Sequence, residues 1–294
     1  MLPGSYIDLH VHSNVSDGKM SVEKIIELAK DTNVSVLSFS EHYNMGSYHL
    51  AKELAGKDIE IIPSVEIGAS LDEFGLSKRH ICHIIAYYPS YKICNILDKY
   101  EESREKCVKK TLNRIQKNIP LSYRDVVRHA RDKNSIGRFD IAIALYKRGY
   151  ARSAIDAYGE FLELGTAGYV AREKMQVTEL IQKIRKVNGV PVIAHPKSLR
   201  LNFDDTFTLL YKLKQAGLEG VEVYNPCNTD EQRRDYLMLC NYFDLLPTCG
   251  SDFHAMSERK VELATGINNN LCISDYAMIQ NLKQRQHNIF MHNK

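Results

Sequence analysis

Nine side chains that can bind a metal ion stand at or just beyond the ends of predicted β-strands. Six of the chain's eleven histidines are among them. His10 and His12 are two residues apart on a strand, so both imidazoles point to one face and can reach one ion. Asp252 and His254 have the same spacing, provided that their backbone is extended. The full set is His10, His12, Asp17, His42, Glu66, His83, His195, Asp252 and His254.

The number and kind of these residues predict more than one metal ion. Nine ligands exceed the coordination of a single ion, and the Glu66 carboxylate could bridge two, so we expect two or three divalent ions. Imidazoles and carboxylates without thiolates suit Mn²⁺, Fe²⁺ or Zn²⁺. The seven cysteines form no CxxC pair, which argues against a thiolate zinc site.

Each residue also has a simpler interpretation when it is taken alone. A histidine at a strand end is more often a surface or hydrogen-bonded residue than a ligand. Glu66 could be a buried, paired carboxylate, and Asp17-Gly18 is a common turn sequence. The occurrence of all nine in order, each at a strand end, favours a site.

The elements that would position these residues alternate between strands and helices. Apolar, β-branched runs predict strands over residues 6–12, 34–39, 59–67, 80–87, 190–194, 220–224 and 246–250. Helical patterns lie between most of them, and Ser21 is a plausible N-cap for the first. This alternation predicts an α/β fold with a parallel sheet, and about seven units with polar ends favour a barrel.

The chain between residues 89 and 178 has a different character. Helical patterns cover residues 93–117, 123–133, 136–147 and 153–164, and almost no β-rich run occurs. We therefore expect a helical insertion domain at 89–178, between a first barrel part at 1–88 and a second at 179–294.

Composition excludes several classes of protein. Apolar content of 44% and charged content of 26% are those of a globular protein, and a net charge of +3 is too small to imply a nucleic-acid partner by itself. No apolar run approaches the roughly 20 residues of a membrane span. The N-terminus lacks a signal-peptide pattern, so we expect a cytoplasmic protein with no membrane partner and no stable protein partner.

Five short motifs resemble those of the PHP (polymerase and histidinol phosphatase) family. They are DLHVHSNVSDG at 8–18, SEH at 40–42, VEI at 65–67 with His83 downstream, AHP at 194–196 and GSDFH at 250–254. Further stretches at 137–138, 169–173, 220–224 and 231–233 are similar to the TrpH-like branch of free-standing phosphoesterases. That branch includes 3′,5′-nucleoside bisphosphate phosphatases and 5′-to-3′ exoribonucleases.

The resemblance implies a distorted (β/α)7 TIM-like barrel that binds two or three metals. By motif, the first ion would take His10, His12, Glu66 and Asp252. A second would share Glu66 and add His83 and His195. A third would take Asp17, His42 and His254. Arg138 and Arg172 are candidate phosphate contacts because a planar guanidinium suits bidentate binding, although surface or ion-paired arginines are as common.

The sequence departs from the family at two places. Glu41 replaces the usual Asp of the second motif, where we expect it to orient His42. Residues 137–143 read GRFDIAI where many relatives have GRPHIAR, so a His and an Arg are missing. This weakens the transfer of substrate identity more than that of the metal chemistry.

The expected function is hydrolysis of phosphate esters of nucleotides or short RNA, through attack by hydroxide held between metal ions. The substrate partner would thus be a small phosphorylated molecule. Two alternatives remain: a histidinol-phosphate phosphatase and a non-catalytic PHP module that binds without turnover. A metal-dependent amidohydrolase would use similar ligands but often a carboxylated Lys, and no Lys stands at a strand end in the right place. The retention of all nine ligands favours an enzyme.

Overall fold

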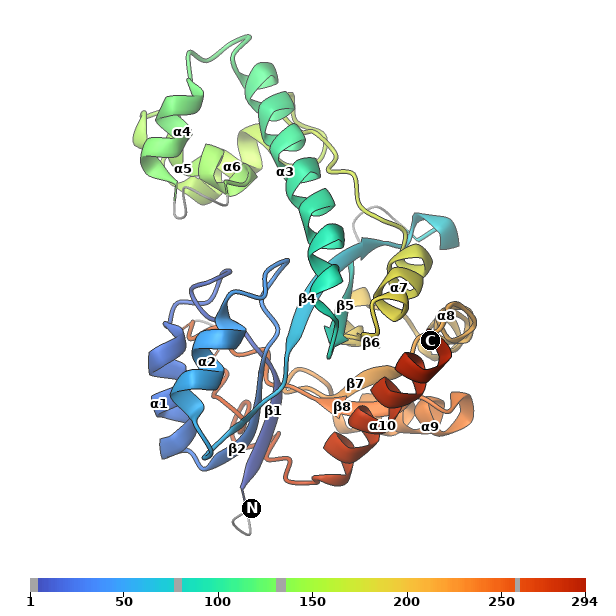
Figure 1. The fold of residues 1–294 in the computed structure, drawn as a ribbon. Coiled ribbons are helices and arrows are strands. Elements are labelled where there is room, and N and C mark those ends of the chain that lie inside the picture. The colour runs from blue at the N-terminus through green and yellow to red at the C-terminus, as the bar shows by residue number, and fades with distance from the viewer. Residues whose placement is uncertain (1–4, 77–80, 131–135, 257–259) are drawn as a thin grey trace. The chain divides into compact units, whose positions relative to one another are not determined.

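The computed structural model describes residues 5–76, 81–130, 136–256 and 260–294. The chain divides into two compact units. Met1–Cys94 and Met175–Lys294 form the first, which we call the α/β unit, and Asn95–Lys174 form the second, which we call the helical unit. All the described strands belong to the α/β unit (Figure 1).

The strands of the α/β unit are arranged in two sheets. The first is parallel and has the order β1-β2-β3. Its strands are β1 (Tyr6–Val11), β2 (Val34–Phe39) and β3 (Glu60–Ile61). The second sheet has the order β4-β5-β6-β7-β8. Its strands are β4 (Ser64–Ser70), β5 (Ile81–Tyr87), β6 (Val190–Ile193), β7 (Gly220–Tyr224) and β8 (Leu246–Cys249).

The expectation of an all-parallel sheet was wrong for β5, which pairs antiparallel with both β4 and β6. The described part of the β4–β5 connection contains only the short 3₁₀ helix η1 (Asp72–Phe74) and no crossover helix, so the chain returns in the opposite direction. β6 then restores the original direction, and the pairs β6–β7 and β7–β8 are parallel.

The single strand expected at 59–67 is two strands in different sheets. Pro63 stands between β3 and β4, and because it has no backbone N–H it cannot continue a ladder. The mixed α/β class is thus as predicted, whereas the described strands form two sheets and not one closed sheet. His80, at the start of the strand expected at 80–87, lies outside the described residues.

Single bridges link the two sheets on both sides, just beyond the strand ends. On one side Val11 pairs in parallel with Phe253, and the Asp252 N–H donates to the His10 carbonyl (2.9 Å). On the other side His42 pairs in parallel with Glu66. The residues predicted to bind metal therefore lie where the two sheets meet.

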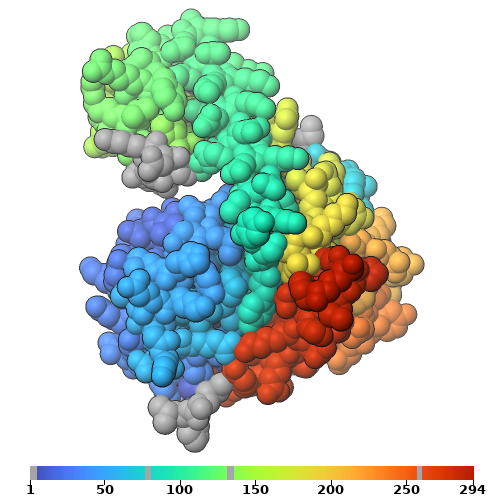
Figure 2. Space-filling model, in the orientation of Figure 1, coloured from blue at the N-terminus to red at the C-terminus, as the bar shows by residue number. Residues whose placement is uncertain are grey.

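Helices cover the sheets of the α/β unit and bury their apolar faces on them. They are α1 (Val22–Asp31), α2 (Ser47–Ala55), α7 (Val177–Lys186), α8 (Phe203–Ala216), α9 (Asp230–Phe243) and α10 (Ala277–His292). Ser21 caps α1 as predicted, by accepting from the Lys24 N–H. Ile279 and Leu282 of α10 pack in one cluster with Ile7, while the helix's other side forms outer surface (red in Figure 2).

The helical unit contains most of α3 (Cys94–Ile115) and all of α4 (Tyr123–His129), α5 (Arg138–Lys147) and α6 (Ala154–Phe161). The predicted helical character of this segment is confirmed, although residues 131–135, which include the end of the helix expected at 123–133, lie outside the described residues. Its core includes Leu112, Ile141, Leu145 and Leu162. Within the described residues of both units, no helix is long and apolar enough to cross a membrane.

Candidate metal centre

The Glu66 carboxylate, buried on β4, lies at the centre of a group of histidines. Its Oε1 is 2.9 Å from both His83 Nδ1 and His195 Nε2, and its Oε2 is 3.0 Å from His42 Nδ1. The Nε2 atoms of His10 and His12 lie 3.5 and 3.4 Å from the same Oε2. Burial opposes ionisation of Glu66, but the surrounding imidazoles outweigh it and hold the pKa well below its usual range.

Four ligand atoms converge on the floor of this group. His10 Nε2 and His12 Nε2 are 3.0 Å apart, and each is within 3.6 Å of Asp252 Oδ1 as well as of Glu66 Oε2. Ligand bonds of about 2.0–2.2 Å place neighbouring ligands about 3.0–3.5 Å apart for bond angles between 90° and tetrahedral. The observed separations match that spacing for His10, His12 and Glu66, which form one of the groups that could hold an ion, and Asp252 Oδ1 lies close to both imidazoles.

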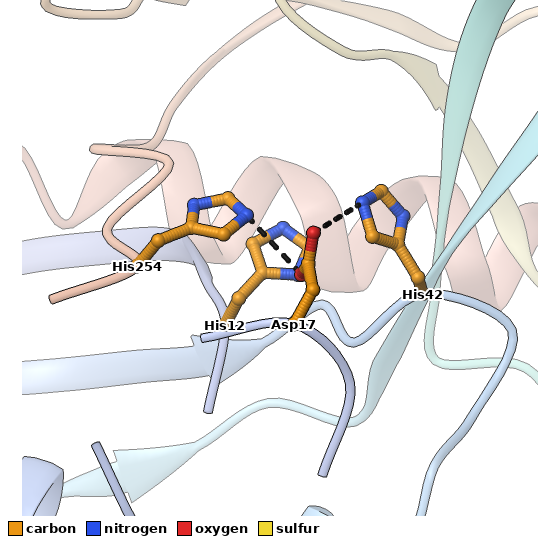
Figure 3. A group of neighbouring side chains, drawn as sticks. All are labelled: His12, Asp17, His42 and His254. Atoms are coloured by element: carbon orange, nitrogen blue, oxygen red, sulfur yellow. Dashed lines mark ion pairs between the residues drawn. The ribbon is translucent and has the colours of Figure 1, made fainter. Parts of the chain in front are cut away.

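A second group of possible ligands surrounds the Asp17 carboxylate, which is partly exposed, and consists of Asp17, His12, His42 and His254 (Figure 3). Its Oδ1 is 3.3 Å from His254 Nε2 and 3.7 Å from His12 Nδ1, and its Oδ2 is 3.7 Å from His42 Nε2. Burial raises the pKa of Asp17, but the hydrogen bond with His254 and the charges of the other histidines lower it below its usual range. This group also has the composition and spacing of a metal site.

The turn that carries Asp17 depends on Gly18. The Gly18 N–H donates to the Ser13 carbonyl (2.9 Å), and a Cβ at this position would collide with the backbone of His12 and Ser13. The Asp17-Gly18 pair therefore forms a turn, as its simpler interpretation says, and in the same place presents its carboxylate to three histidines.

Hydrogen bonds to the far ring nitrogens fix how the imidazoles face the cluster. His10 Nδ1 is 2.8 Å from Glu222 Oε1, and His254 Nδ1 is 2.8 Å from the Asp252 carbonyl. Both partners accept, so Nδ1 carries a proton toward them and Nε2 is the nitrogen that faces the cluster. Burial opposes protonation of His10, but Glu222 and Glu66 outweigh it and raise its pKa well above the usual range.

Glu222 is a functional residue that the sequence analysis missed. It is fully buried on β7, and besides facing His10 it accepts from the His195 N–H (2.7 Å) and from Asn225 Nδ2 (3.2 Å). The sequence did contain a signal for Glu222: it stands between two valines in an apolar strand, and Glu66, which was predicted as a ligand, stands between Val65 and Ile67 in the same way. Glu222 therefore orients two of the predicted ligands.

Glu41 contacts different residues from those expected. Its buried carboxylate accepts from the Ser13 N–H (3.1 and 3.2 Å) and from the hydroxyls of Ser13 and Ser16. The expectation was that it orients His42; these bonds instead hold the loop that carries Asp17. The extra methylene of Glu over Asp gives the carboxylate the reach to accept from both serines.

Two of the clustered residues have a left-handed backbone. Asp252 has φ +55° and His195 has φ +26°. The extended backbone expected at 252–254 was therefore wrong, although His254 Nδ1 still lies 3.5 Å from Asp252 Oδ1. Such conformations cost about 1–3 kcal/mol in non-glycine residues and concentrate at functional sites.

One buried polar atom of the cluster has no hydrogen-bond partner among the described residues, as expected of a metal ligand. His42 Nδ1 is buried and has no hydrogen bond of acceptable geometry, although Glu66 Oε2 is only 3.0 Å away. His42 belongs to two of the groups that could hold an ion, one with Glu66 and His83 and the other with His12, Asp17 and His254. Imidazole and carboxylate donors also suit divalent ions of the first transition row, so the residues fit.

A cavity of about 580 Å³ opens onto the cluster. Seven of the nine predicted ligands line it, together with polar and apolar residues of neighbouring loops. The other two, His10 and His12, are completely buried beneath it. The seven are Asp17, His42, Glu66, His83, His195, Asp252 and His254.

The two arginines proposed as phosphate contacts lie in the helical unit. The Arg138 guanidinium donates to the Val170 carbonyl (3.3 Å) and lies over the Tyr169 ring. Arg172 donates to the Tyr100 carbonyl (2.9 Å) and lies over that ring. Their role in substrate binding stays a prediction.

The chain belongs to the PHP domain family, whose pattern matches residues 8–189, more than half of the sequence. It is 29% identical over 252 residues to a 5′-3′ exoribonuclease of Haemophilus influenzae, an alignment that covers 84% of this chain and 89% of the relative. It is 24% identical to a 3′,5′-nucleoside bisphosphate phosphatase of Chromobacterium violaceum, with 86% and 88% covered.

A solved structure from Bifidobacterium adolescentis, described as a metal-dependent phosphoesterase, has the same fold. Its TM-score is 0.72, and the match covers 96% of this chain and 97% of the other at 23% identity. The comparisons confirm the predicted family and the predicted class of enzyme, a hydrolase of phosphoester bonds.

Proposed function

We propose that this protein hydrolyses phosphate esters of nucleotides or short RNA with two or three divalent metal ions. The observation that carries the proposal is the convergence of five imidazoles on the Glu66 carboxylate at the floor of an open cavity. We further propose that the two linked sheets are a distorted (β/α)7 barrel of PHP type, with residues 89–178 as a separate helical domain.

The proposed ligand groups follow the geometry. His10, His12, Glu66 and Asp252 would hold the first ion, because their atoms have the separations of neighbouring ligands. Glu66 Oε1, His83 and His195 would hold a second. Asp17, His42 and His254 would hold a third. Mn²⁺, Fe²⁺ and Zn²⁺ all suit these donors.

Exposure within the cluster defines the side from which substrate approaches. His10, His12 and Glu66 are at most 1% exposed, whereas Asp17 is 40% and His42 is 26% exposed. The ester would therefore enter over Asp17 and His42, with His10 held in place beneath by Glu222. When bound, the ions would neutralise phosphate charge and lower the pKa of a bound water to about 7.

The substrate class is supported by the relatives and by the size of the cavity. The two relatives compared above act on RNA and on a nucleoside bisphosphate, as their names state. A volume of about 580 Å³ lies within the range of small-molecule sites, roughly 300–1,000 Å³, and exceeds what one phosphate group needs. Nucleotides and RNA ends fit both observations.

The test is metal quantification and phosphate release with Mn²⁺ from a panel of substrates. The panel contains adenosine 3′,5′-bisphosphate, AMP, a short 5′-phosphorylated RNA and histidinol phosphate. We expect preferred turnover of the bisphosphate or the RNA. Turnover of histidinol phosphate alone would overturn the substrate, and bound metal without any turnover would indicate a binding module.

Two variants test the site itself. Glu66→Gln and Asp17→Asn should each lower kcat by at least a thousandfold with the fold retained, because each removes a charged ligand from the cluster. Glu27→Gln is the matched control, since Glu27 is exposed on α1 away from the cavity. Near-normal activity in Glu66→Gln would refute the assignment.

A further inference from the structure

The loop after β6 brings two basic side chains to the cavity. Lys197 lies in the 3₁₀ helix η3 (Pro196–Leu199), and Arg200 follows it directly. Both side chains line the same cavity as the proposed metal ligands. This loop belongs to the α/β unit and begins at His195, itself a member of the cluster.

The backbone of this loop is held in a costly conformation on both sides of η3. His195 has φ +26° and Arg200 has φ +54°, so both non-glycine residues are left-handed. The Arg200 N–H closes the turn by donating to the Lys197 carbonyl (2.9 Å). Strain of about 1–3 kcal/mol per residue persists where it serves to position side chains.

Within the described structure, the positive charges of these two residues are not neutralised by ion pairs. The acidic residues that line the cavity, Asp17, Glu66 and Asp252, all pair with histidines. The Lys197 ammonium donates to the Cys227 carbonyl, which leaves it further hydrogens to donate. Among the residues that the structure describes, neither Lys197 nor Arg200 pairs with a carboxylate.

We propose that Lys197 and Arg200 bind a second phosphate of the substrate, the one that is not being hydrolysed. The planar Arg200 guanidinium suits bidentate contact with phosphate oxygens, and Lys197 adds a point charge. Val261 and Ile267, which line the same cavity, offer apolar surface for the nucleoside between the two phosphates. This inference rests on the proposed function and names the feature of the substrate that the site recognises.

The consequence is a preference for substrates with two phosphates. A nucleoside 3′,5′-bisphosphate, or an RNA end with an adjacent phosphodiester, fills both anion sites at once. A nucleoside monophosphate fills only the site over the metal cluster. Because charge-assisted hydrogen bonds to phosphate contribute about 1.5–3 kcal/mol, loss of one contact lowers kcat/KM by about 10- to 150-fold.

The experiment compares Arg200→Gln, Arg200→Lys and wild-type enzyme on adenosine 3′,5′-bisphosphate, 3′-AMP and AMP. We expect Arg200→Gln to lower kcat/KM for the bisphosphate at least tenfold more than for either monophosphate, mainly through KM. Arg200→Lys should recover part of the loss, since it keeps the charge without the fork. Lys197→Gln should give a loss of the same kind. Arg234→Gln, an exposed arginine on α9 outside the cavity, is the control.

The outcomes separate this inference from the proposed function. If Arg200→Gln lowers kcat/KM equally for all three substrates, or does not lower it, the second phosphate site is overturned. Turnover by the wild-type enzyme would still support the proposed phosphoesterase activity. If the wild-type enzyme turns over none of the three and does not hydrolyse a short 5′-phosphorylated RNA either, the proposed function fails. In that case the inference is tested by equilibrium binding of adenosine 3′,5′-bisphosphate. The wild-type protein should bind it at least tenfold more tightly than the Arg200→Gln protein does, and equal affinities would overturn the inference.

Discussion

At the scale of single residues, the site depends on carboxylates buried inside apolar strands. Glu66 and Glu222 are at most 1% exposed, and every contact described for their carboxylates is with an imidazole or an N–H group. A buried carboxylate without such partners would be costly. Each therefore fixes the positions of the histidines around it as much as the histidines stabilise its charge.

We predict that Glu222→Gln weakens metal binding about 10- to 100-fold, the usual effect of losing a partner of a ligating histidine. Both oxygens of Glu222 accept: one from His10 Nδ1 and the other from the His195 N–H. The amide of Gln would present an NH₂ to one of these donors, so one bond is lost. Metal titration of the apoprotein measures the effect, and excess metal should restore activity.

The control is Glu219→Gln, a change of the same kind in the residue before β7. Glu219 pairs with Arg185 and Arg285, both outside the cavity lining. It should leave metal affinity unchanged. Equal affinities for the Glu222→Gln and wild-type proteins would show that His10 needs no help from Glu222.

The nine proposed ligands stood out in the sequence because their types and spacing are those of metal ligands, and each lies on or just after a recognisable strand or in the loop that follows one. Their partners were harder to find. Glu222 stands in the middle of a strand, and whether a mid-strand carboxylate points to solvent or to a cluster depends on which sheet face is covered. Glu41 was noticed, but its actual partners, Ser13 and Ser16, depend on how a loop folds back.

At the scale of elements, the site forms because the residues that follow β8 pack directly against β1. The chain after β8 passes close to β1: the Ser251 N–H donates to the buried Asp8 carboxylate (2.9 Å) and the Asp252 N–H to the His10 carbonyl. Gly250 permits this approach, since a Cβ there would collide with His10 Cβ and with Glu222 Oε1.

We predict that Gly250→Ala destabilises the protein by about 1–3 kcal/mol, because the added methyl overfills a packed site. It should also weaken metal binding, since the colliding atoms belong to His10 and its partner Glu222. Thermal unfolding and metal content measure the two effects separately.

Gly159→Ala is the matched comparison. Gly159 lies inside helix α6, and the nearest atom to an added Cβ is Glu163 Oε2 at 3.9 Å, an ordinary contact. Alanine in a helix interior is favoured over glycine by about 0.5–1 kcal/mol, so this variant should be more stable than wild type. A Gly250→Ala protein as stable as Gly159→Ala would contradict the packing argument.

The strands were predictable from sequence, but their directions were not. Runs of β-branched residues mark where strands lie, and most of the expected bounds agree with the structure. Direction depends on the connection, and the residues after β4 gave no pattern that distinguished a reversal from a crossover. Pro63 was a signal that the sequence analysis did not use: its missing N–H marks the break between β3 and β4, inside the single strand expected at 59–67.

At the scale of the whole molecule, the proposed ligands come from almost the full length of the α/β unit. His10 and His254 are the first and last of them, and β1, β2, β4, β5, β6 and β8 each lie next to at least one. Such a set is assembled only when the unit is folded. Metal binding must therefore stabilise the folded state over the unfolded one.

We predict that removing metal with a chelator lowers the melting temperature by about 5–10 °C. One site whose ion is present at 100 times its dissociation constant would stabilise the protein by about 2.7 kcal/mol, so the predicted shift is the contribution of a single site and further sites would add to it. For a chain of this size each kcal/mol corresponds to roughly 2–4 °C. Calorimetry before and after chelation, and again after addition of Mn²⁺ or Zn²⁺, measures the shift and its reversal.

The Glu66→Gln variant shows whether the shift comes from this cluster. Glu66 belongs to the first and second proposed groups and lies 3.0 Å from His42 of the third, so its neutralisation should remove most of the stabilisation by metal. Chelation should then change the melting temperature of the variant far less than that of wild type. An equal shift in both proteins would place the stabilising ions elsewhere, because a cluster whose central charge is gone cannot hold its metal with unchanged affinity.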